Sequence, residues 1–221
     1  MQPFLIGVFG GSGSGKTTFV DILRAVFSED EVCLVNQDNY YKSIEDMPVD
    51  ANGYENFDLP ITINKRALRH DIERLIAGET FEIPKYLFNN ALATPEMLMF
   101  RSAPIIIVEG LFVMHYKKIK ALFDLSVFVD CSDTNKVIRR IKRDALERNY
   151  NTRDVMYRYE HHVSPSYRRY IEFYRDEADV VVNNNKDMLQ GVLMMTGFLA
   201  AKLGKPFDAN KVVAVFEQFR R

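Results

Sequence analysis

The sequence has no tryptophan, only two cysteines and no long hydrophobic run. No apolar stretch reaches the roughly 18 residues that a membrane-spanning helix needs, so we expect no membrane partner. The N-terminal MQPFLIGVFGG lacks a basic region ahead of its apolar residues, which predicts a first strand rather than a signal peptide. We therefore expect a cytoplasmic protein. Cys33 and Cys131 each lie within a β-like apolar run, which favours buried thiols in a reducing compartment over a disulfide.

An excess of charge of either sign is also missing, because 29 Lys and Arg residues face 30 Asp and Glu residues. The summed charge therefore gives no indication of a nucleic-acid partner. With 47% hydrophobic and 27% charged residues, the composition is typical of a soluble globular protein. A chain of 221 residues is long enough for one α/β domain with a large core. No metal-ligand spacing joins its four histidines to one another or to a cysteine.

Short runs rich in Val, Ile and Leu alternate with longer helical periods, which is the pattern of a parallel α/β sheet. The runs are nearly continuous in apolar residues, as expected for strands covered on both faces. We predict strands at Phe4–Phe9, Val32–Asn36, Pro104–Gly110, Leu125–Asp130 and Ala178–Asn184, and helices at about 16–27, 61–77, 132–149, 152–177 and 186–203. The segment Tyr40–Pro60 is predicted to be a long loop, and such loops are more often functional than accidental.

A glycine-rich loop lies between the first predicted strand and the first predicted helix. Gly10, Gly15, Lys16 and Thr17 match the pattern G-x-x-x-x-G-K-[ST] of a phosphate-binding loop. Its glycines let backbone N–H groups turn toward phosphate oxygens, and the following helix adds its positive end. Lys16 is expected to reach the β and γ phosphates, and the Thr17 hydroxyl to ligate Mg²⁺. The ATP-binding residues predicted here are Gly10, Gly11, Ser12, Gly13, Ser14, Gly15, Lys16, Thr17 and Thr18.

Two carboxylates follow predicted strands at the edge where open parallel sheets bind ligands. Glu109 ends the run PIIIVE, and we predict that it binds Mg²⁺ directly or through water. Asp38 follows the strand that ends at Asn36, and it is our candidate for the base that takes a proton from the acceptor hydroxyl. The alternatives are a solvated carboxylate for Glu109 and an Asx-turn residue for Asp38.

Seven segments occur in an order that is specific in combination: GGSGSGKTT, QDNYY, ENFDLP, IPKY, IIIVEG, FVDCSDTNKVIRRIKRDALER and EADVVVNN. From Phe4 to about Asn184 the chain resembles a member of the uridine kinase and phosphoribulokinase family. The resemblance implies a P-loop NTPase fold, with a five-stranded parallel sheet flanked by helices and an arginine-bearing lid helix. It further implies an ATP- and Mg²⁺-dependent kinase that transfers the γ-phosphate to a 5′-type primary hydroxyl of a nucleoside or related ribosyl compound.

The same resemblance implies roles for single residues on the acceptor side. Asp38 matches the catalytic base, and Asp58 matches the carboxylate that holds the ribose hydroxyls. Such a carboxylate accepts hydrogen bonds from two neighbouring hydroxyls, although a loop carboxylate facing water is the alternative. Tyr86 matches the aromatic residue of the base pocket, and Arg140 matches a ribose contact.

Two further arginines match lid residues that approach the phosphates. Arg143 is expected to stabilise the charge of the transferred phosphoryl group, and Arg148 to bind ATP. The alternative is a solvated helix face, since Asp144 and Glu147 could pair with these arginines.

The chain departs from the family at the groups that read the base. Where uridine kinases have IP-x-YDF followed by a His, this chain has Leu87 for the Asp and Ala91 for the His. Tyr150 replaces a second Arg, and Arg158 replaces a usual Gln. These two side chains are candidates to contact a different acceptor. We therefore predict weak activity on uridine and cytidine relative to some other ribosyl compound, unless neighbouring residues supply the missing contacts.

Other functions remain open at this point. A kinase of the same family could act on a nicotinamide riboside, a sugar phosphate or a pantothenate-like acceptor. A regulatory nucleotide-binding module of the GTPase type is a further alternative, but the guanine-reading N-K-x-D motif is absent from the sequence.

We assign residues 1–205 to the kinase domain and residues 206–221 to a C-terminal helix. Asp208 stands at a helix-capping position, and Val212, Val215, Phe216 and Phe219 follow at helical spacing. This helix is expected to pack on its own domain or to take part in a homo-oligomer contact.

Overall fold

The computed structural model describes residues 2–87, 94–147 and 151–220. Its centre is a parallel sheet with the strand order β2-β5-β1-β6-β7. The first strand of the chain is the central one, as a doubly wound sheet requires, because the chain crosses from one side of β1 to the other. The strands are β1 (Phe4–Phe9), β2 (Val32–Asn36), β5 (Ile105–Glu109), β6 (Leu125–Asp130) and β7 (Val180–Asn183). The predicted five-stranded parallel sheet is confirmed.

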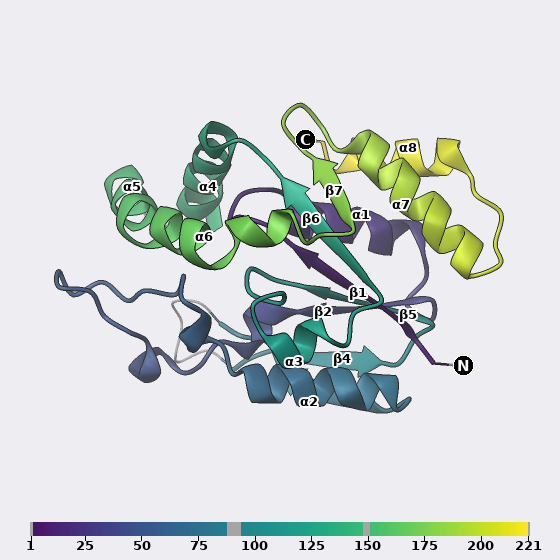
Figure 1. Cartoon of the computed structure of the whole chain (residues 1–221), viewed down its shortest axis with the longest axis horizontal. Helices are drawn as coiled ribbons and strands as arrows, with labels where there is room; N and C mark the ends of the chain where they lie inside the picture. Colours follow the sequence, from purple (N-terminus) through teal and green to yellow (C-terminus); the bar gives the residue numbers. More distant parts are fainter. Residues whose placement is uncertain (1, 88–93, 148–150, 221) are drawn as a thin grey trace.

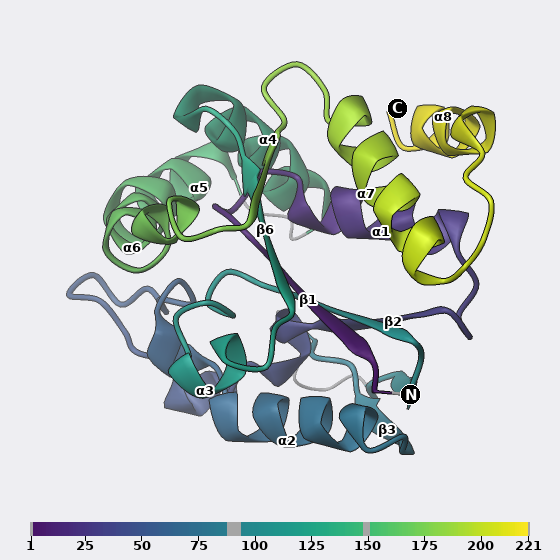
Figure 2. The same cartoon turned by 45° about the vertical axis from the view of Figure 1, so that its right-hand side comes forward.

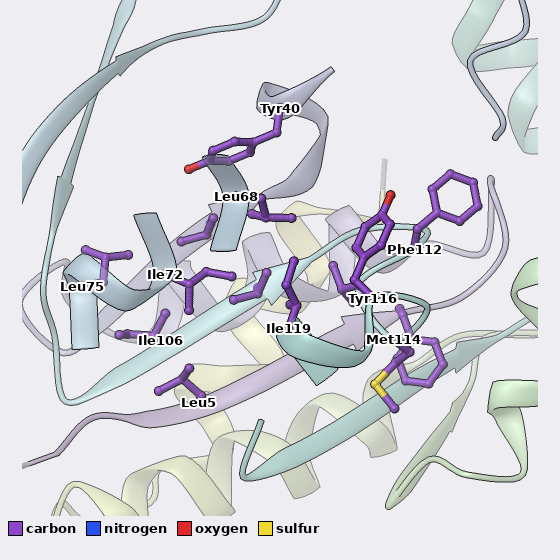
Figure 3. Close-up of a cluster of buried hydrophobic side chains, with 14 of the residues drawn as sticks. Leu5, Tyr40, Leu68, Ile72, Leu75, Ile106, Phe112, Met114, Tyr116 and Ile119 are labelled. Carbon is purple, nitrogen blue, oxygen red and sulfur yellow. The ribbon is translucent and has the colours of Figure 1, made fainter. Parts of the chain in front are cut away.

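Helices cover both faces of the sheet, and alternate strand residues supply the two cores (Figure 1). One face packs on α1 (Lys16–Val26), α7 (Leu189–Lys202) and α8 (Ala209–Gln218). The other face packs on α2 (Lys65–Ile76) and α3 (Lys117–Lys120), as Figure 2 shows from the side. In Figure 3, Leu5 and Ile106 of the sheet lie under Leu68, Ile72 and Leu75 of α2. Burial of such side chains stabilises the fold by about 1.5–3 kcal/mol each.

An antiparallel pair, β3 (Thr80–Pro84) and β4 (Met97–Arg101), lies outside the main sheet. Its strands alternate between exposed and buried side chains, and the rings of Phe81 and Phe100 stack at 5.7 Å between centroids. This pair is not among the strands predicted from the apolar runs.

The helix predicted at 152–177 is wrong as a single element. The segment forms α5 (Thr152–Arg158), the π-helical turn η4 (Tyr159–Val163), α6 (Ser164–Tyr170) and the 3₁₀ turn η5 (Glu172–Arg175). Within η4 the Ser164 N–H donates to the Tyr159 carbonyl, five residues back. Pro165 follows directly and has no N–H to donate, so the regular helical ladder cannot continue through this point.

The C-terminal helix α8 begins as its capping residue predicts. The Asp208 carboxylate accepts hydrogen bonds from the backbone N–H groups of Asn210 and Lys211. Val212 and Phe216 are buried in the core that α1 and α7 share. Among the described residues no helix combines the length and apolarity needed to cross a membrane.

Candidate active site

The phosphate loop follows β1 and leads directly into α1, which begins at Lys16. Gly13 and Gly15 have φ values of 79° and 97°, a left-handed conformation that favours glycine. A Cβ atom at Gly13 would lie 2.5 Å from the Lys136 carbonyl oxygen, and one at Gly15 would lie 2.3 Å from Nδ2 of Asn184. The loop therefore requires glycine for both its conformation and its close packing.

Lys16 and Glu109 form a buried pair at the carboxyl ends of β1 and β5. Nζ of Lys16 donates to the Gly11 carbonyl at 3.2 Å and lies 4.0 Å from Oε1 of Glu109. Burial lowers the pKa of Lys16, while the charges of Glu109 and Asp38 oppose that shift. Burial raises the pKa of Glu109 to about 7, against the attraction of Lys16. A bound metal cation would favour the ionised carboxylate.

The oxygen donors at this point suit a magnesium ion. The Thr17 side chain lies close enough to Glu109 to lower the pKa of that carboxyl, so a hydroxyl and a carboxylate lie together beside the phosphate loop. Mg²⁺ prefers such oxygen ligands and usually completes its shell with water and substrate phosphates. Among the described residues no cluster of three His, Cys, Asp or Glu side chains could hold a metal ion by itself. Thr17 and Glu109 would therefore hold Mg²⁺ jointly with bound phosphates.

Asp38 lies in the 3₁₀ turn η1 (Gln37–Tyr40), directly after β2. Its backbone N–H donates to Oδ1 of Asn36 at 2.8 Å, so Asn36 fixes the turn. The half-buried Asp38 acts electrostatically on both Lys16 and Glu109. The register pairs Asn36 with Glu109 across β2 and β5, which brings the two predicted carboxylates to one edge.

Asp58 and Arg140 meet in the interior, although they come from distant parts of the chain. Nη1 of Arg140 donates to the Ser12 hydroxyl at 2.9 Å and lies 3.5 Å from Oδ1 of Asp58. Asp58 is buried, with an exposed fraction of 8%. The side chain of Arg140 belongs to α4 (Asp133–Glu147), so this contact joins that helix to the phosphate loop.

Asp144 pairs with both Arg140 and Arg143 of α4. Its Oδ2 lies 3.1 Å from Nε of Arg140, and its Oδ1 lies 2.8 Å from Nη2 of Arg143. The pairing with Asp144 that the alternative expects is therefore present. The side chains of Asp144 and Arg140 are buried, at 1% and 7% exposed, whereas Arg143 is 34% exposed. Arg148 and Tyr150 lie outside the described residues, as does Ala91.

Three aromatic side chains gather next to Asp38. The ring of Tyr86 lies 5.4 Å from that of Tyr41, which in turn lies 5.6 Å from Phe57. The Tyr86 N–H donates to Oδ1 of Asn39 at 3.3 Å, which ties the end of the β3 strand to the turn that carries Asp38. Tyr41 and Phe57 belong to the motifs QDNYY and ENFDLP, but neither residue is predicted from the sequence as a site residue.

Arg158 contacts the long loop. Its Nη1 donates to the Glu55 carbonyl at 2.7 Å, and its guanidinium lies 5.2 Å from the ring centroid of Tyr54. The neighbouring Tyr157 hydroxyl donates to Asp50, which also contacts Nε2 of His162 at 2.8 Å. The helix α5 is therefore tied to the loop at 50–55.

A cavity of about 290 Å³ lies beside the phosphate loop. Gly15 and Thr18 line one side, and Arg139 and Asn184 line another. Asn184 Nδ2 donates to the Ser14 carbonyl at 2.8 Å, and Arg139 Nη2 donates to the Asn184 carbonyl at 3.1 Å. Three residues from the C-terminal end of the chain complete the lining: Phe216, Phe219 and Arg220. Neither Asn184 nor the C-terminal helix is predicted from the sequence to lie at this site.

Comparison with known proteins agrees with this arrangement. Residues 5–189 match the Phosphoribulokinase / Uridine kinase family. The chain is 31% identical over 206 residues to a uridine kinase of Streptococcus pyogenes, which covers 92% of this chain and 98% of that protein. It is 33% identical over 211 residues to uridine-cytidine kinase A of Dictyostelium discoideum, covering 95% of this chain and 42% of that one.

The chain thus spans less than half the length of the Dictyostelium relative and of the uridine/cytidine kinase of Arabidopsis thaliana that it matches. Among solved structures, D-glycerate 3-kinase from Cryptococcus neoformans has the same fold, with a TM-score of 0.57 at 14% identity over 82% of this chain and 86% of that one. The match over most of the sequence and the phosphate-loop architecture together show that this chain belongs to the Phosphoribulokinase / Uridine kinase family.

Proposed function

We propose that the protein is an ATP-dependent kinase that transfers the γ-phosphate to a 5′-type primary hydroxyl of a nucleoside or related ribosyl compound. One observation supports this most: Lys16, Glu109 and Asp38 lie together at the carboxyl edge of the sheet. A cation for phosphates, a carboxylate for Mg²⁺ and a carboxylate for the acceptor are the groups that phosphoryl transfer to a hydroxyl requires.

In this mechanism the phosphate loop and Lys16 hold the β and γ phosphates of ATP. Asp38 orients the acceptor hydroxyl and takes its proton as the oxygen attacks the γ-phosphorus. The bond from that phosphorus to the β–γ bridging oxygen breaks, and ADP leaves. Mg²⁺ held through Thr17 and Glu109 would offset the charge on the phosphates. Arg143, and Arg148 outside the described residues, would approach the transferred group from the lid helix.

Asp58 and Arg140 would hold the ribose of the acceptor. The buried Asp58 carboxylate can accept from both hydroxyls of a cis-diol, and Nη1 of Arg140 lies beside it. Tyr86, with Tyr41 and Phe57, offers aromatic surface for the attached base. The cavity of about 290 Å³ beside Thr18 would take the nucleoside part of the donor.

The base of the acceptor is the finer question. The relatives named above are uridine or uridine-cytidine kinases, which supports a pyrimidine nucleoside. Leu87 and Arg158 stand where the family has an Asp and a Gln, and the described contacts of Arg158 include Glu55 and Tyr54. These departures support the second candidate, a kinase for a non-pyrimidine ribosyl acceptor.

A panel of acceptors assayed by coupled ADP release tests the proposal. It should contain uridine, cytidine, adenosine, nicotinamide riboside, a sugar phosphate and pantothenate, each with ATP and with GTP. A kcat/KM for uridine of about 10⁴ M⁻¹s⁻¹ or more would overturn the prediction of an altered acceptor. ATP binding without ADP release on any acceptor would instead indicate a regulatory nucleotide-binding module.

A further inference from the structure

A second, larger cavity is lined by the segment that follows Asp58. It has a volume of about 1510 Å³ and opens between the loop at 59–64, α2 and α3. Figures 1 and 2 both show α2 and α3 side by side on the same face of the sheet. Its lining contains no residue of the phosphate loop and none of the carboxylates assigned to phosphoryl transfer. We call this cavity the α2–α3 cleft.

Positive charge dominates the α2–α3 cleft. Two carboxylates line it, Asp46 and Glu73, against six cationic side chains: Lys42, Lys65, Arg66, Arg69, Lys117 and Lys118. This local excess stands out in a chain whose formal net charge is −1. A concave site lined by one sign of charge concentrates ligands of the opposite sign.

Among the described residues, most of these cations have no carboxylate partner. Arg69 pairs with Glu73 at 2.8 Å, and Asp46 accepts from the Ser43 hydroxyl. Across residues 2–87, 94–147 and 151–220, none of the other five cations makes an ion pair within 4.0 Å. Lys65 also acts on His115 at the cleft wall, where burial first and then this positive charge lower the histidine pKa. The cleft therefore holds positive charge that a bound anion would neutralise.

Part of the cleft lining is apolar and aromatic. Leu59, Pro60 and Ile61 form one wall, and Tyr116 and Tyr170 face the same space. Tyr116 is fixed, because its hydroxyl donates to the Pro60 carbonyl at 2.8 Å and its ring packs above the core in Figure 3. Small-molecule sites combine such apolar walls with a few charged groups, and their usual volume of about 300–1,000 Å³ is exceeded here.

We propose that the α2–α3 cleft binds a phosphorylated small molecule, with its phosphate chain among Lys65, Arg66 and Lys118 and its uncharged part against Tyr116 and Tyr170. A compact multivalent anion matches a rim of neighbouring cations, and phosphate accepts hydrogen bonds from Lys and Arg with charge assistance. Free polyphosphate and nucleotides share this chemistry. A nucleotide would add ring contacts with the two tyrosines.

The test is calorimetric titration of the full chain with inorganic tripolyphosphate. We expect two sites in the wild type, one at the phosphate loop and one in the cleft. Lys16→Ala should lose the phosphate-loop site and retain the cleft site, and Arg66→Glu with Lys118→Glu should retain the phosphate-loop site at its wild-type affinity. The double variant should weaken cleft binding by about tenfold or more. Arg101→Glu, an exposed charge change at the end of β4 outside the cleft, is the matched control and should retain both sites.

Two results would overturn the proposal: a single site in the wild type that Lys16→Ala removes, or a second site that the double variant leaves unchanged. If circular dichroism shows that Arg66→Glu with Lys118→Glu has lost its fold, the neutral substitutions Arg66→Gln with Lys118→Gln are tested instead. Repeating the titration of Lys16→Ala with ATP identifies the ligand type. If ATP binds more tightly than tripolyphosphate, the nucleoside part of ATP contributes to binding in the cleft. If the two bind equally, the cleft recognises the phosphate chain alone. Because binding is measured without turnover, an inactive enzyme would contradict the proposed kinase function and not this site.

Discussion

Nη1 of Arg140 lies 3.5 Å from Oδ1 of Asp58, a residue 82 positions away in the sequence. The same Arg140 atom donates to the Ser12 hydroxyl in the phosphate loop. One guanidinium therefore connects α4, the loop that would hold the acceptor and the loop that would hold the donor. Binding at either side should affect the other through this contact.

Asp58→Ala should raise KM for a riboside by about 10- to 100-fold, because a hydrogen bond to a charged group contributes about 1.5–3 kcal/mol. The 2′-deoxy analogue, which lacks one of the two hydroxyls, should lose much less. Steady-state kinetics on the matched pair of acceptors measures this difference. Equal losses on both would show that Asp58 does not bind the diol.

Asp38→Asn should lower kcat strongly and leave ATP affinity nearly unchanged. The amide keeps the shape of the side chain but cannot take the proton of the acceptor hydroxyl. Single-turnover kinetics combined with equilibrium ATP binding separates the two effects. Loss of ATP binding with kcat retained would instead assign Asp38 to the metal or to the structure of the turn.

Lys16→Ala should reduce turnover by at least about 100-fold, as expected when a positioned charge on the transferred phosphate is removed. The fold should persist, because Lys16 contacts the Gly11 carbonyl and Glu109 rather than the apolar core. Circular dichroism checks the fold, and ADP release checks turnover. Lys205→Ala removes an exposed cation that pairs with the half-buried Glu31, far from the phosphate loop in the sequence; it is the control and should alter turnover by less than about twofold. Turnover of Lys16→Ala within about tenfold of the wild type would contradict the assignment of the phosphate loop.

Without ligands, the protein should lose stability as pH rises from about 4.5 toward 7, through the contribution of Glu109. Its pKa in the folded state is raised to about 7 by burial, with Asp38 and Asp21 adding to the shift and Lys16 opposing it. Between the two pKa values the folded state binds more protons than the unfolded state, so the free energy of unfolding falls with pH. Glu109→Gln should flatten this slope. Urea unfolding at a series of pH values measures it, and identical slopes for both proteins would contradict the assignment.

Gly15→Ala should destabilise the fold more than Gly204→Ala. Both residues have left-handed backbones, with φ values of 97° and 66°, so each substitution costs about 1–2 kcal/mol. At Gly15 the added Cβ would also lie 2.3 Å from Nδ2 of Asn184, whereas at Gly204 it would meet no described atom within 4 Å. The free energy of unfolding in urea gives the comparison. Equal destabilisation would show that Asn184 moves aside at no cost.

The parts of the fold that the sequence predicts are those set by local pattern. Continuous apolar runs identify the five strands, and strand-end position brings Asp38 and Glu109 to one edge, since parallel strands end together. The β3–β4 pair is not predicted, because its alternation of apolar and polar residues is short and its stability depends on packing of Phe81 and Phe100. The α2–α3 cleft is not predicted from the sequence either, because its cations come from separate segments of the chain. No spacing along the chain indicates that Lys42, Lys65 and Lys118 share one space.

The π-helical turn at Tyr159–Val163 sets the rotational phase between α5 and α6. One residue of an α-helix corresponds to a rotation of about 100°, so the extra residue of a π turn decides which side chains face inward beyond it. On one side of the turn Arg158 faces Glu55, and on the other the ring of Tyr167 lies 3.7 Å from Nζ of Lys136. A one-residue deletion within η4 would remove the extra residue of the π turn and rotate one set of contacts away from its partners. Relatives that gain or lose a residue here would therefore need a compensating change in the loop at 50–55.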